Sequence, residues 1–438
     1  MTLPELLDLA RTANPGLRAG AAATEAMEAQ VSEARRNWLP TGDLLSILGP
    51  SPSIQCQTPD GLPTTKALRE QNCISTSAGE AGPSNLSFSQ VFTRTEVRLI
   101  QPVWDFGKIS AGVAAARAGV DVSREREAGA RADLDLNIRR AYYGLKLARE
   151  LIATLEEGTS YIDDGQKRIE SDLAKGTGTA GVTDKLRLRT IRAEVDARVL
   201  EAKRGEALAR DGLRALLGPD GPADVDVDDE PLEALDVKPR PAGYYEDLAR
   251  FNRPEVRMLD SAVRAKHALA DLERRKEYPD FVLVGTATLA YAGGVDNPQN
   301  AFVSHYFNSS SAGVGAALRM QLDLGPRLAR AARTRAEATQ IEYQRADALG
   351  GILFEVRKAY GELTEAQART EAVHKGEKAG KAWISAVAQN FTLGLAEARD
   401  LSDALLAFFQ MRARYLQSVF DLNIAASALT RATGSPGL

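Results

Sequence analysis

Long hydrophobic runs and aromatic residues are scarce in this chain of 438 residues. No stretch reaches the roughly 18 consecutive apolar residues that a membrane-spanning helix needs. Aromatic residues make up 6 % of the sequence and charged residues 26 %, a composition that favours long helices packed along narrow seams over a thick globular core. If the protein lies in a membrane, we therefore expect strands rather than helices to cross it.

One-sided charge and a secretion leader are also lacking. The 55 basic and 59 acidic residues give a net charge of −4 with both signs interspersed, so no basic tail or acidic block points to nucleic acid. Met1 to Ala10 already has an amphipathic helical pattern, which indicates either a cytosolic protein or a chain without its leader. No cysteine opens the chain, so a lipid anchor there is not expected.

Cysteine is limited to Cys56 and Cys73, which both lie in a stretch rich in Pro, Gly, Ser and Thr from 48 to 85. Two unrelated thiols in a cytosolic loop are one interpretation. A single disulfide that closes a loop in an oxidising compartment fits the pattern better.

Catalytic and cofactor motifs do not withstand inspection. Residues 176–181 read G-x-G-x-x-G, but the preceding pattern is a helix that ends near Ala174, so the glycines predict a helix cap and a turn rather than a dinucleotide site. Glu371 and His374 have the Glu-x-x-His spacing of metal-binding bundles, which require a second such pair, and we expect a solvated helix face instead. The sequence thus predicts no enzyme, no cofactor and no metal site.

The strongest positive signal is internal duplication. Residues 1–217 form a first copy and 244–438 a second, and the Pro- and Asp-rich segment 218–243 is a predicted linker. The matching positions include Asp8-Leu9-Ala10 with Asp247-Leu248-Ala249, Pro15 with Pro254, Arg35-Arg36 with Arg274-Arg275, Asp105-Phe106-Gly107 with Asp323-Leu324-Gly325, and Asp184 with Asp400.

Each copy has the order helix, strand, strand, very long helix, glycine turn, return helix. The long helices are predicted at about 110–174 and 327–390, and some 65 residues at 1.5 Å per residue make a rod about 95–100 Å long. Helices of this length require lateral packing against similar rods. The shorter leading helices, near 17–37 and 256–276, could stack end to end with the return helices.

The predicted strands, at about 39–48, 86–103, 280–291 and 311–322, alternate with a period of two and have the length of membrane-crossing strands. A half-buried sheet of a soluble protein would show the same alternation. However, Trp38, Trp104 and Tyr278 stand at the strand–helix junctions, where interfacial aromatic residues would lie. Four strands cannot close a barrel, so a membrane sheet of this kind must be shared by several chains.

Taken together, the duplicated order, the segment 101–107 (QPVWDFG) and the two tip turns at 178–184 and 394–403 resemble the TolC family of outer-membrane efflux ducts. The resemblance implies a mainly α fold with β, in which three protomers share a twelve-stranded outer-membrane β-barrel on a periplasmic α-helical tunnel. It implies a passive exit duct of a tripartite efflux pump or a type I secretion system in a Gram-negative bacterium. The implied partners are a periplasmic adaptor protein and an inner-membrane transporter of the RND or ABC type.

The resemblance also implies roles for individual residues. Asp400 and Asp403 match aspartates that line the periplasmic constriction, although acids in a first helical turn are also favoured as helix caps. Gly178, Asp184 and Gly394 match the hairpin-tip turns. Phe391 and Ala396 depart from the tyrosine and arginine that lock the closed tip in the best-known members, so we expect closure to depend on apolar packing.

An alternative from a different class is a soluble coiled-coil structural or adaptor protein. It would explain the helices, but it leaves the strand runs, the aromatic junctions and the loop cysteines unexplained. Within the duct interpretation, efflux of small molecules and secretion of polypeptides are not separated by the sequence.

Overall fold

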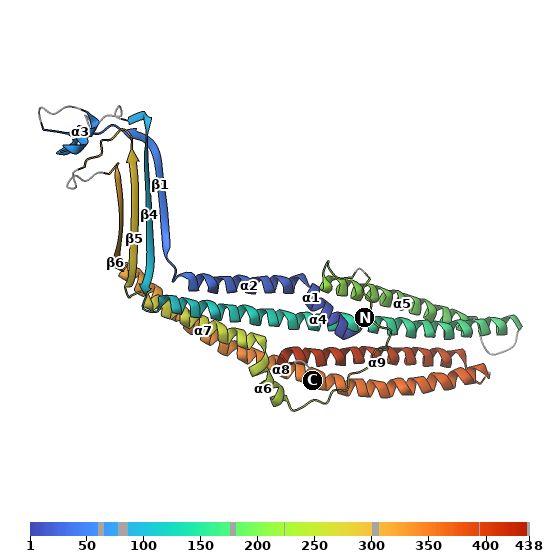
Figure 1. Cartoon of the computed structure of the whole chain (residues 1–438). Coiled ribbons are helices and arrows are strands. Elements are labelled where there is room, and N and C mark those ends of the chain that lie inside the picture. The colour runs from blue at the N-terminus through green and yellow to red at the C-terminus, as the bar shows by residue number, and fades with distance from the viewer. Residues whose placement is uncertain are drawn as a thin grey trace. The chain divides into compact units, whose positions relative to one another are not determined.

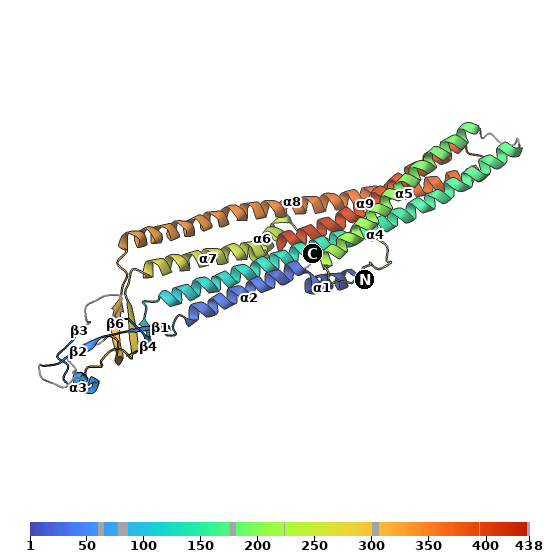
Figure 2. The same cartoon turned by 90° about the horizontal axis from the view of Figure 1, so that it is seen from above.

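The computed structural model describes residues 1–59, 65–77, 86–175, 181–222, 224–299, 306–393 and 395–435. Figures 1 and 2 show the elements from two directions. The helices are α1 (Leu3–Ala13), α2 (Pro15–Arg36), α3 (Lys66–Gln71), α4 (Lys108–Lys175), α5 (Val182–Leu217), α6 (Ala242–Asn252), α7 (Pro254–Arg275), α8 (Leu324–Thr392) and α9 (Ala398–Thr433). The strands are β1 (Thr41–Pro52), β2 (Gln55–Gln57), β3 (Ser75–Ser77), β4 (Leu86–Trp104), β5 (Asp280–Ala292) and β6 (Ser309–Arg319).

The chain forms two compact units, a helical unit (residues 1–27, 118–264 and 339–438) and a sheet unit (residues 28–117 and 265–338). In the helical unit, α4 with α5 and α8 with α9 form two long hairpins, as Figure 2 shows. The apolar stripe that the sequence shows on the long helix, with Leu134, Ile138 and Leu145, is buried. These residues pack against Leu213 of α5 and Leu416 of α9. Helix length here is thus stabilised by side-to-side packing rather than by a central core.

Two helix ends meet two helix starts within this unit. Gly218 follows α5 at a positive φ of 80°, and a Cβ there would lie 2.5 Å from Pro15 Cδ, the first residue of α2. The amide of Asn14 also donates to the Leu216 carbonyl at 2.6 Å. Gly434 follows α9 at φ 67° and packs in the same way against the backbone of Asn252 and Arg253, just before α7. Both copies therefore place a leading helix end to end with a return helix, as the sequence predicts.

The Pro- and Asp-rich segment between the copies packs closely on the helical unit. Val225 and Val227 are buried in the same core as α1, α4 and α5. Asp228 accepts hydrogen bonds from Tyr142 Oη (2.7 Å) and Lys146 Nζ (2.5 Å) of α4. Burial would raise the pKa of Asp228, but the bonds from Lys146 and Tyr142 lower it overall. The segment thus contributes both apolar contacts and an ion pair, more than a simple connection requires.

The sheet unit is built on one four-stranded antiparallel sheet in the order β1-β4-β5-β6. Ser46 lies opposite Thr95, Thr95 opposite Leu289, and Leu289 opposite Ser310. Strand β6 ends at Arg319, so Met320 and Leu322, which continue the alternating pattern in the sequence, lie beyond the sheet. The edge strands β1 and β6 each pair with one neighbour only among the residues that the structure describes.

The packing of the hairpins predicts a difference between two glycines of α4. A Cβ at Gly158 would lie 2.7 Å from Phe409 Cζ of α9, whereas a Cβ at Gly119 would meet nothing within 4 Å. Both Gly→Ala changes gain the same helix propensity, but only Gly158→Ala overpacks a ring. We expect Gly158→Ala to be less stable than Gly119→Ala by about 1–3 kcal/mol. Thermal unfolding followed by circular dichroism measures this, and equal midpoints for the two variants would contradict it.

Candidate functional site

The two faces of the sheet differ in chemistry. The pairing register places Arg94, Glu96 and Arg98 of β4 on one face, as the sequence predicts. The same face carries polar residues from the other three strands and two apolar ones from β1, namely Asp43, Leu45, Ile47, Thr286, Thr288, Ser309 and Ser311. The opposite face is largely apolar and carries Leu44, Leu48, Val97, Leu99, Leu283, Ala287, Leu289, Tyr291, Ala312, Val314 and Ala316.

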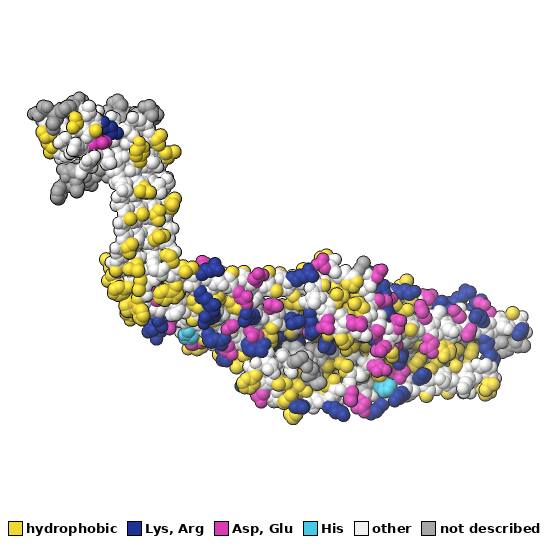
Figure 3. Space-filling view, in the orientation of Figure 1, with side chains coloured by type: hydrophobic (Ala, Val, Ile, Leu, Met, Phe, Trp, Pro, Cys, Tyr) yellow, Lys and Arg dark blue, Asp and Glu magenta, His cyan; other side chains and the backbone are white. Residues whose placement is uncertain are grey.

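The residues that the structure describes leave this apolar face uncovered. Leu44 is 72 % exposed, Leu48 76 % and Val314 82 %. Two polar side chains on this face, Ser46 and Thr95, hydrogen-bond each other through their hydroxyls at 3.0 Å. Figure 3 shows hydrophobic side chains along the sheet, where charged ones are few. An apolar surface of this extent marks contact with an apolar environment or with another chain.

Aromatic side chains gather at the base of the sheet, where the strands join the helices. Trp38, Trp104 and Tyr278 are 42, 58 and 52 % exposed. Phe106 connects two of them, with its ring stacked on Tyr278 at 5.4 Å and edge-on to Trp104 at 6.1 Å. The three aromatic residues singled out in the sequence thus stand at the strand–helix junctions, and a role at a membrane interface remains our prediction.

The loop between β1 and β4 is tied to the loop between β5 and β6. Cys56 and Cys73 form a disulfide with Cα atoms 5.2 Å apart, as the sequence predicts. Asp296, 4 % exposed, accepts from Arg69 Nε at 2.8 Å and from the Cys56 backbone N–H at 3.1 Å. Burial would raise the pKa of Asp296, but the bonds from Arg69 and Cys56 and the nearby positive charge lower it overall. No signal in the sequence identified Asp296 or Arg69, because their partners are far apart in the chain.

Within the helical unit, aspartates near the ends of the hairpins cap helices. Asp400 accepts from the Glu397 backbone N–H at 3.2 Å, and Asp184 of the first copy accepts from the Gly181 N–H at 3.0 Å. Asp403 takes no part in the cap; its side chain is 57 % exposed and 3.8 Å from Arg399. Gly178 and Gly394 lie outside the described residues. Capping thus accounts for Asp400 and Asp184 but not for Asp403.

Also within the helical unit, Phe391 of α8 packs beside the buried core formed by Ile162, Leu188 and Leu405. The guanidinium of Arg168 on α4 lies 5.6 Å from the Phe391 ring centre. This cation–π contact links the two hairpins at Phe391, the position where the best-known members of the family have a tyrosine. Arg168 was not identified from the sequence, because a single arginine in a long charged helix carries no signal.

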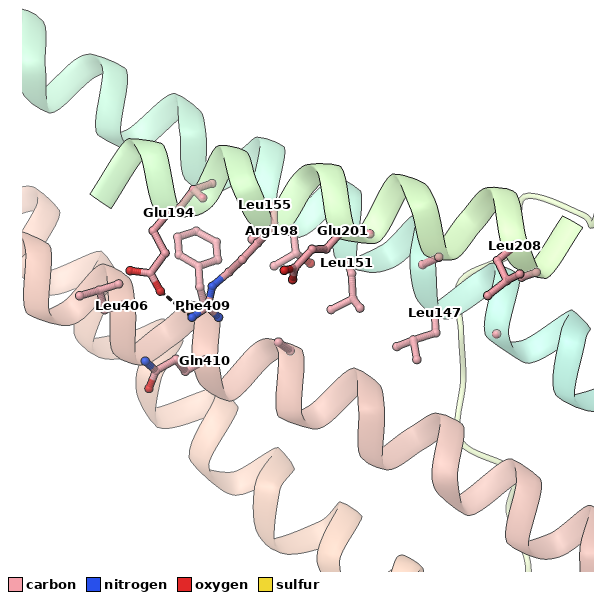
Figure 4. A pocket seen from close by; sticks show the side chains of 18 of the residues that line it. Leu147, Leu151, Leu155, Glu194, Arg198, Glu201, Leu208, Leu406, Phe409 and Gln410 are labelled. Atoms are coloured by element: carbon pink, nitrogen blue, oxygen red, sulfur yellow. Dashed lines mark hydrogen bonds and ion pairs between the residues drawn. The ribbon is translucent and has the colours of Figure 1, made fainter. Parts of the chain in front are cut away.

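A groove of about 700 Å³ lies between α4, α5 and α9. Figure 4 shows Leu147, Leu151 and Leu155 of α4 facing Leu406 and Phe409 of α9 across it. The α5 side carries Leu208 and a charged rim of Glu194, Arg198 and Glu201, in which Arg198 pairs with Glu194 at 2.6 Å. An apolar channel between helices with a charged rim is the shape that accepts another helix.

The histidine on α8 has neighbours that the sequence does not reveal. The side chain of His374 is 38 % exposed, its ring stacks on Tyr415 at 4.5 Å, and its Nδ1 lies 3.7 Å from a carboxylate oxygen of Glu377. Glu371 is exposed and pairs with Lys375 at 2.8 Å. Among the described residues no cluster of three or more His, Cys, Asp or Glu could hold a metal ion. None of the described helices is both long enough and apolar enough to cross a membrane.

A duplicated chain with two long helical hairpins and an open sheet with one apolar face is the chain fold that the resemblance to outer-membrane ducts implies. Residues 246–435 match the model of the family "Outer membrane efflux protein". The second copy is therefore an outer membrane efflux protein domain, and the family expected from the sequence is confirmed.

Comparisons with individual proteins cover most or all of the chain. Protein CyaE of Bordetella pertussis is 25 % identical over all of this chain and 85 % of its own length. The cobalt-zinc-cadmium resistance protein CzcC of Cupriavidus metallidurans is 23 % identical over 78 % of each chain. The solved outer-membrane channel OprN superimposes with a TM-score of 0.75 at 18 % identity, over 99 % of this chain and 90 % of its own. The fold class predicted from the sequence is thus confirmed.

The contact of Asp296 with the loop between β1 and β4 leads to a pH-dependent prediction. Because the pKa of Asp296 is lowered in the folded state, its stabilising effect is complete above the unfolded value of about 4 and is lost as the pH falls through the folded value. We expect Asp296→Asn to increase hydrogen exchange of the loop amides at pH 7 but to have little effect at pH 2–3. Glu70→Gln is the control, since a glutamine can still accept from the Asn297 N–H. Equal exchange of Asp296→Asn and the native protein at pH 7 would refute this role.

Proposed function

We propose that this chain is one of three protomers of an outer-membrane duct, which passively conducts substrates from an inner-membrane transporter across the periplasm and the outer membrane. The observation that carries the proposal is the open sheet, which has one apolar and one polar face. A sheet of this kind suits a barrel wall, with its apolar face toward lipid and its charged face toward an aqueous lumen. In a soluble coiled-coil protein, the exposed apolar face of such a sheet would be unfavourable in water.

The edges of the sheet argue for several copies. Unpaired backbone groups at a lipid-exposed edge each cost several kcal/mol, so membrane sheets close on themselves. The order β1-β4-β5-β6 is antiparallel throughout, so β6 of one copy can continue antiparallel to β1 of the next. Three copies give twelve strands, the barrel that the family resemblance implies.

Assembly is tested by mass and by cross-linking. We expect native mass spectrometry in detergent to detect three chains. Leu45→Cys on β1, combined with Ser309→Cys, Ser311→Cys or Gly313→Cys on β6, should give covalent dimers and trimers for at least one combination. Glu96→Cys with Thr288→Cys is the control, because these positions face each other within one chain and should bond internally. A monomer that yields no intermolecular bond would refute the proposal.

We also propose Asp400 and Asp403 of three chains as the narrowest electronegative constriction of the duct. Asp403 supports this, because it is exposed and is not needed for the cap. Asp400 supports it less, since its cap already explains an aspartate there. Six carboxylates around a narrow pore would attract cations and bind multivalent ones. Asp184 is proposed as a polar contact of the neighbouring hairpin and not as a pore-lining residue.

Conductance in planar bilayers distinguishes the gate from the cap. Asp400→Asn with Asp403→Asn removes the charge but retains a cap acceptor. We expect this variant to lose cation selectivity and block by divalent or trivalent cations. Asp184→Asn, the same change at the matching cap of the first copy, should retain both properties. Unchanged selectivity and unchanged block in the double variant would show that these aspartates serve only as helix caps.

A periplasmic adaptor protein and an inner-membrane transporter of the RND or ABC type are the proposed partners. The groove between α4, α5 and α9 is a candidate surface for a helix of the adaptor, because its apolar floor and charged rim match an amphipathic helix. Leu208 on its rim is 73 % exposed in the single chain.

A further inference from the structure

The basic residues at the base of the sheet are mostly engaged within the chain. Lys108 Nζ donates to the Tyr278 carbonyl at 2.6 Å and pairs with Asp280 at 2.7 Å. Arg327 pairs with Asp323 at 2.5 Å. Both side chains are therefore held by partners within the chain, which makes them less available to an external anion than an unpaired cation.

Arg35 and Arg36, the last two residues of α2, are different. Both are exposed, and neither forms an ion pair with any residue that the structure describes. The chain then turns tightly, with the Leu39 N–H donating to the Arg36 carbonyl at 2.8 Å. Trp38 and Leu39, 42 and 57 % exposed, thus follow the two arginines with only Asn37 between. Two unpaired cations and two exposed apolar side chains occupy one turn.

The second copy of the duplication shows that this arrangement is not simply what the repeat dictates. Its matching arginines are Arg274 and Arg275. Arg274 lies 3.2 Å from Asp271, and Arg275 Nη1 donates to the Phe106 carbonyl at 3.0 Å. The same dipeptide is therefore engaged within the chain in one copy and available in the other.

We propose that Arg35, Arg36 and Trp38 bind the phosphate of an anionic glycerophospholipid in the periplasmic leaflet of the outer membrane. The planar guanidinium matches phosphate oxygens in a bidentate manner, and an indole favours the headgroup level of a bilayer. Leu39 and the apolar face of β1, which begins at Thr41, continue from this turn toward the acyl chains. Attraction of the arginines to the C-terminal end of the α2 dipole would account for the charges but not for the exposed Trp38 and Leu39. The inference rests on the membrane orientation proposed above.

Native mass spectrometry of the full chain in detergent tests the proposal, with phosphatidylglycerol or phosphatidylcholine added as the probe. We expect tighter binding of phosphatidylglycerol, and about 25-fold weaker binding in the Arg35→Gln/Arg36→Gln variant at low salt, from about 1 kcal/mol for each arginine. Arg204→Gln/Lys378→Gln is the matched control, because it removes two exposed cations of the helical unit for which the described residues show no ion pair. This control should bind phosphatidylglycerol as the native protein does.

Trp38→Ala should weaken the binding of both lipids, since the indole is proposed to contact the headgroup region irrespective of its charge. The proposal would be overturned if phosphatidylglycerol binding fell equally in Arg35→Gln/Arg36→Gln and in Arg204→Gln/Lys378→Gln. It would also be overturned if the native protein bound the two lipids equally. A lower thermal midpoint of Arg35→Gln/Arg36→Gln with unchanged lipid binding would assign the arginines to the helix dipole and would also overturn it. Failure of the native protein to insert into lipid nanodiscs is a separate outcome, which would contradict the proposed duct.

Discussion

Backbone hydrogen bonding is the constraint on which the rest of the structure depends. Among the described residues, the sheet of β1, β4, β5 and β6 pairs its inner strands on both sides and pairs β1 and β6 on one side only. In water, the unpaired N–H and C=O groups of such edges would hydrogen-bond to solvent. However, the large apolar side chains on one face of this sheet are unfavourable in water. The duplication supplies strands in pairs, and the shared barrel proposed above would complete both edges at once.

The sequence predicts the repeated elements well because each has a strong periodic signal. The buried positions Leu134, Ile138 and Leu145 of α4 follow the helical period. The faces of β4 follow the period of two, so Arg94, Glu96 and Arg98 were correctly placed together. Even the end-to-end helices follow from counting residues in each copy.

Contacts between distant segments were less accessible. The Arg69–Asp296 pair and the contact of Arg168 with Phe391 join residues more than 200 positions apart, and neither residue type is unusual where it stands. The stacking of His374 on Tyr415 was not predicted either, since the two rings come from different helices. Periodicity reports the face of an element but not the identity of its neighbour.

The helix ends at Gly218 and Gly434 have a mechanical consequence. The C-terminus of α5 abuts the N-terminus of α2, and α9 abuts α7 in the same way. The dipoles of the two helices in each pair therefore point in the same direction, although no peptide bond connects the helices at the junction. Pro15 and Pro254, at the starts of α2 and α7, lack the N–H that would otherwise need a partner there. Each column of helix thus contains a joint without a covalent bond across it. At these joints one half-helix can tilt against the other at the cost of a few contacts, whereas bending a continuous helix would break its ladder of hydrogen bonds.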